Sequence, residues 1–125
     1  MNRNQIEAFT VRWLGAICSG NLAEFEHLTA ATSLDTKTGQ SVTRAAFQAR
    51  ARAVHQAFEA LAGNVEALLV DGDQIAWRWS LHGLQRAPFL GQLTLGKRVT
   101  LSGVNFQRLE HGVVTEHFTL LDVLS

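Results

Sequence analysis

The carboxylates near the C-terminal end of the chain are the side chains best suited to proton transfer. The stretch Glu116-His117-Phe118-Thr119-Leu120-Leu121-Asp122 is apolar apart from an acid at each end and one histidine. Side chains alternate along a strand, so Glu116, Phe118 and Asp122 are expected on one face, with His117 on the other. A carboxylate placed in apolar surroundings loses hydration, keeps its proton more readily and becomes a stronger base. An acid that points inward from such a strand is therefore either badly placed or poised for chemistry, and Asp122 is the residue in question.

The composition favours a small-molecule partner. The 125 residues are enough for one domain, 1–125, and the eleven basic and eleven acidic side chains cancel. A neutral chain has no electrostatic footprint for nucleic acid or an anionic membrane surface. No stretch resembles a signal peptide or a membrane span, so we expect a cytoplasmic protein. The single Cys18 excludes an internal disulfide, and no Cys/His spacing is typical of a metal site.

Helical periodicity fills the first half of the chain. Apolar residues from Ile6 to Ile17 recur at helical spacing, and Gly20 is expected to end this helix. Asn21 with Glu24 resembles a capping box for a short second helix. After a possible short strand over 32–34 and a polar loop, Thr43 is expected to cap a long helix that runs to Gly63.

The period changes to that of strands in the second half. We expect strands over 65–70 and 75–81 joined by the Asp71-Gly72 turn, then a strand over 98–109, the turn Glu110-His111-Gly112 and a closing strand. Helices followed by a meander indicate an α+β domain. The expected architecture is a cone in which N-terminal helices pack on a strongly curved mixed or antiparallel sheet and enclose a pocket.

Several stretches carry a resemblance to a known family. They read VDGDQIAWRW, GLQRAPFLG and KRVTLSGVNFQRLEHGVVTEHF, followed by Asp122, and they include the opening helix with SGNLAEF. The chain resembles the SnoaL-like polyketide cyclases of the nuclear-transport-factor-2-like superfamily, which share a Glu-Gly-Asp turn, an Arg-Trp strand, a Gly-rich loop and a final Glu-His-Trp with an Asp four residues on. The resemblance implies a cofactor-free intramolecular aldol ring closure in which Asp122 matches the acid–base residue.

The chain departs from that family at three positions. Gln107 stands nearest to the place of a histidine on the preceding strand, Gln85 replaces the histidine of the loop, and Phe118 replaces the tryptophan of the last strand. Glutamine orients a carbonyl group but carries no proton. The sequence also contains no tyrosine, which argues against an oxyanion hole or a water site built on tyrosine hydroxyls.

The remaining candidate residues are expected to shape a substrate pocket. Trp79 is expected either to pack in the sheet core or to stack on a flat substrate, and Phe89 to close the cavity mouth. Arg86 is expected either to be a surface residue or to bind a carbonyl or carboxylate group. Polar residues in an otherwise apolar strand usually hydrogen-bond something specific, which applies to Asn105 and Gln107. The full substrate-binding set is Trp79, Arg86, Phe89, Asn105, Gln107, Phe118 and Asp35, with no metal ligand and no cofactor.

Three functions remain open. The first is a cofactor-independent enzyme that acts on a small hydrophobic carbonyl compound through Asp122, and the second is a non-catalytic protein that binds such a compound. The third is a structural domain whose cone is filled by its own side chains. A homodimer is expected through the outer face of the sheet, whose apolar residues are read as Val104, Phe106, Leu121 and Val123.

Overall fold

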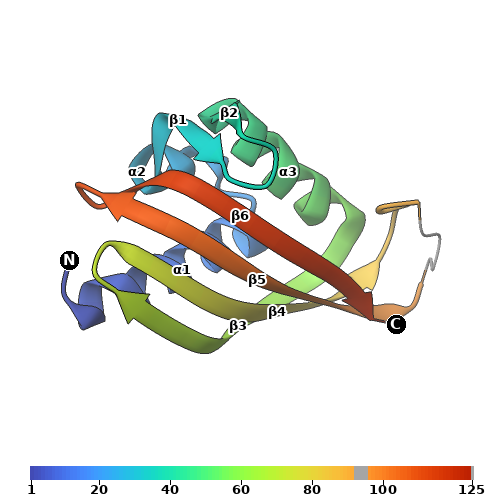
Figure 1. Ribbon diagram of the computed structural model, residues 1–125. Helices are drawn as coiled ribbons and strands as arrows, with labels where there is room; N and C mark the ends of the chain where they lie inside the picture. Colours follow the sequence, from blue (N-terminus) through green and yellow to red (C-terminus); the bar gives the residue numbers. More distant parts are fainter. Residues whose placement is uncertain (92–95, 125) are drawn as a thin grey trace.

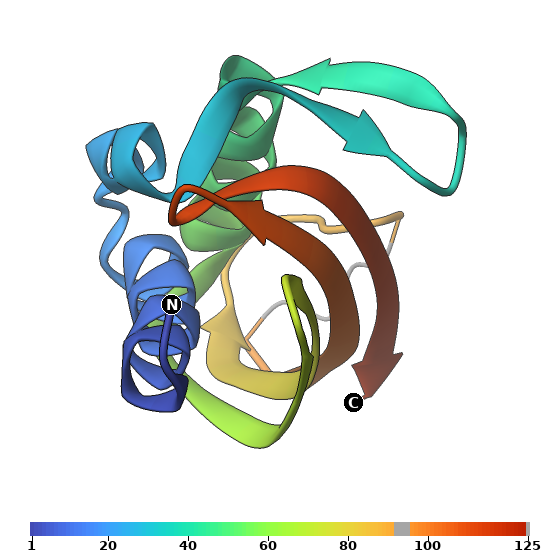
Figure 2. The same ribbon diagram turned by 60° about the vertical axis from the view of Figure 1, so that its left-hand side comes forward.

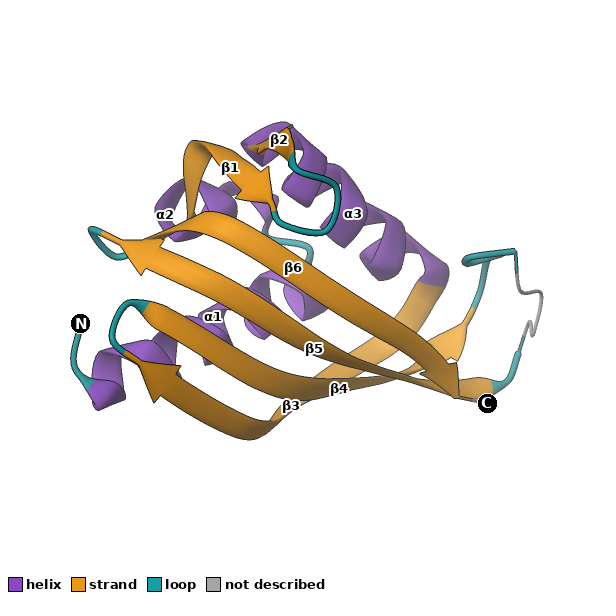
Figure 3. Cartoon of the chain, viewed as in Figure 1, coloured by secondary structure: helices purple, strands orange, loops and turns teal. Residues whose placement is uncertain are grey.

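The computed structural model describes residues 1–91 and 96–124, with side chains described as far as Asp122. Helices come first and strands dominate the second half (Figures 1 and 3). In chain order the elements are α1 (Arg3–Ser19), the 3-10 helix η1 (Leu22–Glu24), α2 (Phe25–Leu28), β1 (Thr29–Asp35), β2 (Gln40–Thr43), α3 (Arg44–Ala57), β3 (Phe58–Asp71), β4 (Gln74–Gln85), β5 (Arg98–Glu110) and β6 (Val113–Leu124).

The six strands form one mixed sheet in the order β2-β1-β6-β5-β4-β3. Strands β1 and β6 are parallel, and every other neighbouring pair is antiparallel. Seen from the side in Figure 2, the sheet curls around an interior that the helices close along one flank. The expected α+β cone with a curved mixed sheet is confirmed.

Helix α1 is capped at both ends by its own sequence. The Asn2 side chain accepts a hydrogen bond from the Gln5 backbone N–H, and the Gln5 side chain accepts one from the Asn2 backbone N–H, both at 2.8 Å. This is a capping box, which satisfies two N–H groups at the helix start. Gly20 ends the helix in the left-handed region at φ 72°. The capping box expected at Asn21 is wrong, because its side chain makes no capping hydrogen bond.

The long helix ends earlier than its apolar spacing predicts. Thr43 caps α3 as expected, by accepting a hydrogen bond from the Ala46 backbone N–H, but the helix stops at Ala57 and strand β3 begins at Phe58. The expected end at Gly63 is therefore wrong. Phe58 is already extended, and Ala60 has a positive φ of 56° where the pairing of β3 with β4 shifts register. A bulge at this point bends β3 so that it can follow the curved sheet.

The core lies between the helices and the concave face of the sheet. Trp13 of α1 lies near its centre, with ring centroids 5.1 Å from Phe25 and 5.7 Å from Phe47. The sheet contributes buried side chains that include Ile75, Trp77, Leu81, Val99, Leu101, Leu109 and Val114. None of the helices in the described part of the chain combines the length and apolar character that crossing a membrane would require.

Candidate functional site

The hairpin between β5 and β6 decides which side chains face the interior of the cone. His111 and Gly112 form its turn with positive φ values of 54° and 81°, as two-residue hairpin turns require. Glu110 pairs with Val113 and Leu109 with Val114, but the next pair is Arg108 with Glu116. Thr115 is therefore an extra residue in β6, which makes this a β-bulge.

The bulge reverses the faces of the last strand. A register without it would pair Gln107 with Glu116 and would turn Glu116, Phe118 and Asp122 inward. With it, Gln107 pairs with His117 and Asn105 with Thr119. Because a slip of one residue moves every side chain to the opposite face, the interior receives His117 and Thr119 instead.

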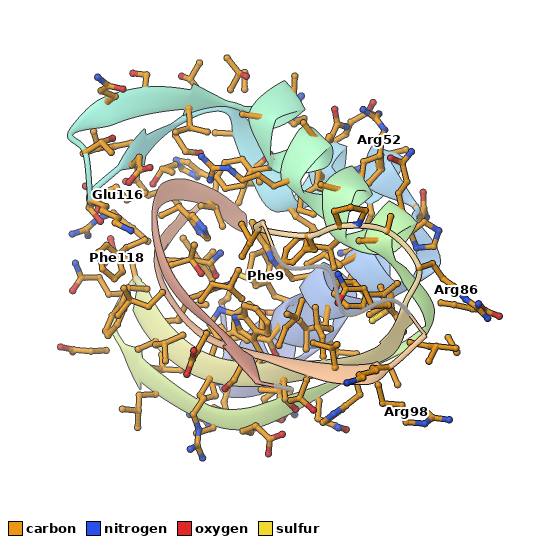
Figure 4. All side chains as sticks on the ribbon, turned by 90° about the vertical axis from the view of Figure 1, so that its right-hand side faces the viewer. Phe9, Arg52, Arg86, Arg98, Glu116 and Phe118 are labelled. Atoms are coloured by element: carbon orange, nitrogen blue, oxygen red, sulfur yellow. The ribbon has the colours of Figure 1, made fainter. Side chains whose placement is uncertain are left out.

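Asp122 consequently lies on the outer face of the sheet. It pairs with Ser102 and is exposed to solvent. The expectation that it is held in an apolar hollow is wrong, and the physical reason is the extra residue at Thr115. Figure 4 shows Glu116 and Phe118 on the same outer side of β6. Glu116 forms an ion pair there, with its Oε2 2.5 Å from Nε of Arg108.

A cavity of about 400 Å³ lies inside the cone, between the helices and the curved sheet. Its walls are mostly apolar, with two tryptophans, three phenylalanines and several aliphatic side chains. The lining residues are Trp13, Ile17, Phe25, Phe47, Arg50, Ala51, Ala53, Val54, Trp79, Leu81, Phe89, Leu90, Leu101, Asn105, His117, Thr119 and Leu121. The cone is thus not filled by its own side chains, and the purely structural alternative loses its basis.

Asn105 is fixed by two hydrogen bonds to one oxygen atom. Its Oδ1 accepts from Nε1 of Trp79 at 3.1 Å and from the hydroxyl of Thr119 at 2.7 Å. An indole N–H can only donate, so the oxygen of the amide must face Trp79. In the described residues no fully buried polar side-chain atom lacks a partner, and Nδ2 of Asn105 has no hydrogen bond. This amide nitrogen is therefore open to the cavity that Asn105 lines.

His117 is a second polar group in the cavity wall, and it is only 6% exposed. Its ring stacks on Trp13 at 5.6 Å between centroids and meets the edge of Phe47 at 5.0 Å. Burial and, to a smaller extent, the positive charge of Arg50 lower the pKa of His117 to about 4, although the negative charge of Asp35 acts in the opposite direction. The imidazole is therefore neutral at neutral pH.

Gln107 lies behind His117, deeper in the fold. It is 3% exposed, its Oε1 accepts a hydrogen bond from Nε1 of Trp77 at 2.8 Å, and its amide nitrogen lies 3.1 Å from Nδ1 of His117. It does not line the inner cavity. Sequence reasoning found Gln107 and Asn105 as polar residues on one face of a strand, but it placed His117 on the outside. The side on which His117 lies depends on the register of β5 with β6, which the sequence alone does not reveal.

Trp79 and Phe89 line the cavity, as expected for both. Trp79 forms part of the wall opposite the helices. Phe89 comes from the loop after β4 and packs its ring against Phe58 at 5.5 Å between centroids, a position that suits the expected apolar cover.

The other three candidates lie outside the inner cavity. Arg86 forms an ion pair with Glu59 and points away from the interior in Figure 4. Phe118 packs against Phe106 on the outer face at 5.9 Å between centroids. Asp35, at the end of β1, accepts a hydrogen bond from the Lys37 backbone N–H at 2.9 Å, which is a turn interaction.

The charges around the cavity are unequal. The lining contains the arginine Arg50, whose guanidinium carbon lies 5.7 Å from the centre of the Phe47 ring, and no aspartate or glutamate belongs to the described lining. The described residues also hold no cluster of three or more histidine, cysteine or acidic side chains that could bind a metal ion. The polar groups offered to a ligand are the amide of Asn105, the imidazole of His117, the Thr119 hydroxyl and a guanidinium.

Comparison with known proteins agrees with this architecture. TsrD from Streptomyces laurentii has a TM-score of 0.86 and 20% identity, covering 98% of this chain and 91% of that one. IdmH from Streptomyces antibioticus has a TM-score of 0.75 and 21% identity, covering 93% and 91%. A SnoaL-like polyketide cyclase from Agrobacterium tumefaciens has a TM-score of 0.77 and 15% identity, covering 91% and 88%.

At these identities the solved structures establish the nuclear-transport-factor-2-like fold and not the reaction. No curated protein matches the chain. The sequence model of the SnoaL-like polyketide cyclases, however, matches residues 8–125, nearly the whole chain. On this evidence the chain belongs to the SnoaL-like polyketide cyclase family.

Proposed function

We propose that this protein binds a small, flat, hydrophobic carbonyl compound in the inner cavity and promotes its enolisation, as ring closure or isomerisation requires, without a cofactor. The observation that carries the proposal is an apolar cavity of about 400 Å³ in which the nitrogen of a fixed amide, Asn105, is open to the interior. Apolar walls with a few fixed polar groups are typical of small-molecule sites.

The proposed chemistry stabilises negative charge on the carbonyl oxygen. When a proton leaves the carbon next to the carbonyl, the electron pair of the C–H bond moves into the enolate and charge collects on oxygen. An N–H group that already points at this oxygen stabilises the enolate more than the ketone. No carboxylate belongs to the described lining, so the proton passes to water or to a buffer base, and Asp122 takes no part.

The test uses 2-tetralone, a flat bicyclic ketone with acidic α-protons, in deuterated buffer. Wild-type protein is expected to accelerate α-proton exchange, followed by NMR. Asn105→Ala removes the donor without adding a carboxylate, which would itself be a base in the cavity. This variant is expected to lose at least tenfold in exchange rate, which corresponds to about 1.4 kcal/mol or more of transition-state stabilisation.

Asp122→Ala is the matched control, because it makes the same truncation to alanine on the outer face. Its exchange rate is expected to equal that of the wild type. Loss of exchange in Asp122→Ala with full exchange in Asn105→Ala would overturn the proposal and restore the carboxylate mechanism.

A binding protein without catalysis is the second candidate. The absence of any acid from the described cavity lining favours it, since no carboxylate there can take the proton. Trp13 and Trp79 lie in the cavity wall, so ligand binding is expected to change tryptophan fluorescence. Saturable binding of 2-tetralone without faster exchange would identify a binding protein. If 2-tetralone neither binds nor exchanges faster, both functions are rejected.

We also propose a homodimer through the outer face of the sheet. Phe106 and Leu120 are 50% and 52% exposed there, and Phe118 packs beside Phe106. Adjacent apolar side chains of this size are more often covered by a partner than left in water. Leu121, expected on this face, lines the inner cavity instead, and the Val123 side chain lies outside the described residues.

The dimer is tested by light scattering at several protein concentrations. Phe106→Lys is expected to shift the protein to monomer, because a charge cannot be buried in an apolar interface without a partner. Val11→Lys, at a residue 63% exposed on α1, is the control and leaves a dimer. A wild-type protein that stays monomeric at high concentration contradicts the proposal.

A further inference from the structure

Three side chains form a hydrogen-bonded chain from the core of the sheet to the cavity. Nε1 of Trp77 donates to Oε1 of Gln107 at 2.8 Å, and the amide nitrogen of Gln107 lies 3.1 Å from Nδ1 of His117. All three residues are buried, with exposed fractions of 1%, 3% and 6%. Water therefore has little access to rearrange these bonds.

The chemistry of the first residue fixes the direction of the whole chain. The indole nitrogen has a proton and no lone pair to accept with, so the Gln107 oxygen must face Trp77. The NH₂ group of Gln107 then faces His117, and an NH₂ group can only donate. Nδ1 of His117 must accept, which leaves the proton of a neutral imidazole on the other nitrogen, Nε2.

We propose that Gln107, anchored by Trp77, is a positioning residue that holds neutral His117 as the Nε2–H tautomer, so that this histidine donates a hydrogen bond to an oxygen of the ligand. The same logic applies to Asn105, whose oxygen is held by Trp79 and Thr119. Two buried tryptophans thus turn two neighbouring side chains into donors toward one cavity.

The surroundings of His117 support this arrangement. The ring is held between the face of Trp13 and the edge of Phe47, so it cannot turn without displacing both. No fully buried polar side-chain atom in the described residues is without a partner, and Nε2 has no hydrogen bond. This nitrogen is therefore reachable from the cavity. Burial and the charge of Arg50, against the weaker pull of Asp35, keep the ring neutral.

The ligand chemistry follows from the direction of these donors. The cavity suits a molecule that presents acceptor oxygens, such as a ketone, an enolate or a carboxylate, to His117 and Asn105. A ligand that presents only N–H groups cannot form hydrogen bonds with these two side chains, because both sides are donors. This consequence rests on the proposed function, whereas the tautomer is a property of the free protein and is tested without any ligand.

The first test is the nitrogen-15 spectrum of the histidine rings in free wild-type protein. The two nitrogens of a neutral imidazole differ clearly in chemical shift, and the tautomer is read from which of them carries the proton. His117 is assigned by its absence from the spectrum of His117→Gln; the other histidines, His27, His55, His82 and His111, are all exposed. The Nε2–H form is expected, and a predominant Nδ1–H form or an imidazolium at neutral pH would overturn the proposal.

The second test reverses the direction of the chain with Gln107→Glu. A carboxylate can accept from Trp77 with one oxygen and from an Nδ1–H group with the other, so the expected result is a proton on Nδ1 of His117. Gln74→Glu makes the same substitution at an exposed position on β4 and should leave the spectrum unchanged. A folded Gln107→Glu protein that keeps a bare Nδ1 would show that Gln107 does not set the tautomer.

The third measurement separates this inference from the proposed function. If wild-type protein has the Nε2–H tautomer and binds 2-tetralone at least tenfold more tightly than Gln107→Glu does, both hold. If the tautomer is as stated but 2-tetralone does not bind, the proposed function fails while the role of Gln107 stands. If 2-tetralone binds equally to both proteins, the donor role of His117 is wrong.

Discussion

Replacing Gly103 with alanine is expected to lower the free energy of unfolding by about 3 kcal/mol. Gly103 lies on β5 opposite Trp79, and the indole ring covers it. A Cβ atom added at Gly103 would lie 2.6 Å from Cε2 and 2.8 Å from Cη2 of Trp79. The ring cannot move aside freely, because its Nε1 is bonded to Asn105. Chemical denaturation at neutral pH measures the loss.

Gly15→Ala is the matched control for this prediction. Gly15 lies on the exposed side of α1, and no atom lies within 4 Å of the position that its Cβ would take. Alanine in a helix interior is favoured over glycine, so this variant is expected to gain about 0.5–1 kcal/mol. An equal effect of the two substitutions would mean that the Trp79 ring is not fixed over Gly103.

A change at Gly103 should also reach the cavity. If the Trp79 ring is displaced, Oδ1 of Asn105 loses one of its two donors, and the amide is no longer held with its nitrogen toward the interior. A folded Gly103→Ala protein would then bind carbonyl ligands less tightly, although Gly103 itself touches no ligand. Packing and function are linked here through one hydrogen bond of 3.1 Å.

The fold could be predicted from the sequence because its signals are local. The first hairpin turn is Gly72-Asp73, one residue after the expected Asp71-Gly72, and the second is His111-Gly112. Each contains a glycine with a positive φ, which glycine adopts readily, and they fix where strands reverse. Helix α1 is amphipathic and ends at Gly20. These features depend on neighbouring residues alone, so reading along the chain recovers them.

The site could not be predicted in the same way, because its side chains are placed by register. One extra residue, Thr115, decides whether Asp122 or His117 faces the interior. Nothing in the local sequence around Thr115 separates a regular hairpin from a bulged one, since both faces of β6 carry apolar residues. The polar residues of β5 do indicate which face of β6 points inward. Asn105 and Gln107 lie on the inner face of β5, and the residues of β6 that pair with them there are the ones able to form hydrogen bonds with them.

The polar groups inside the cone thus have fixed hydrogen-bond directions, and none of those in the described cavity lining is acidic. Carboxylates such as Glu116 and Asp73 are used on the surface, where both pair with Arg108. Inside, the hydrogen bonds run from tryptophan to amide. This division explains how a chain with eleven acidic residues places none of those described in the lining of its inner cavity.

The protein is expected to lose stability between about pH 6.5 and pH 4 through His117. The pKa of this buried imidazole is lowered from 6.5 to about 4 in the folded state. Below pH 6.5 the unfolded chain takes up a proton that the folded chain does not, so the free energy of unfolding falls as the pH falls. Near pH 4 both states are protonated and the loss levels off. The full effect is on the order of 3 kcal/mol.

Urea unfolding at a series of pH values measures this loss, and two variants isolate its source. Carboxylates also titrate in the lower part of the range, so the informative quantity is the difference between the wild-type profile and that of His117→Gln, which has no imidazole at this position. The His117→Gln profile is expected to be flatter above pH 5, whereas His27→Gln, at an exposed histidine, keeps the wild-type slope. Parallel profiles for wild type and His117→Gln would mean that the imidazole has the same pKa in the folded and the unfolded protein. The cavity wall would then carry an imidazolium cation at pH values where a neutral hydrogen-bond donor is expected.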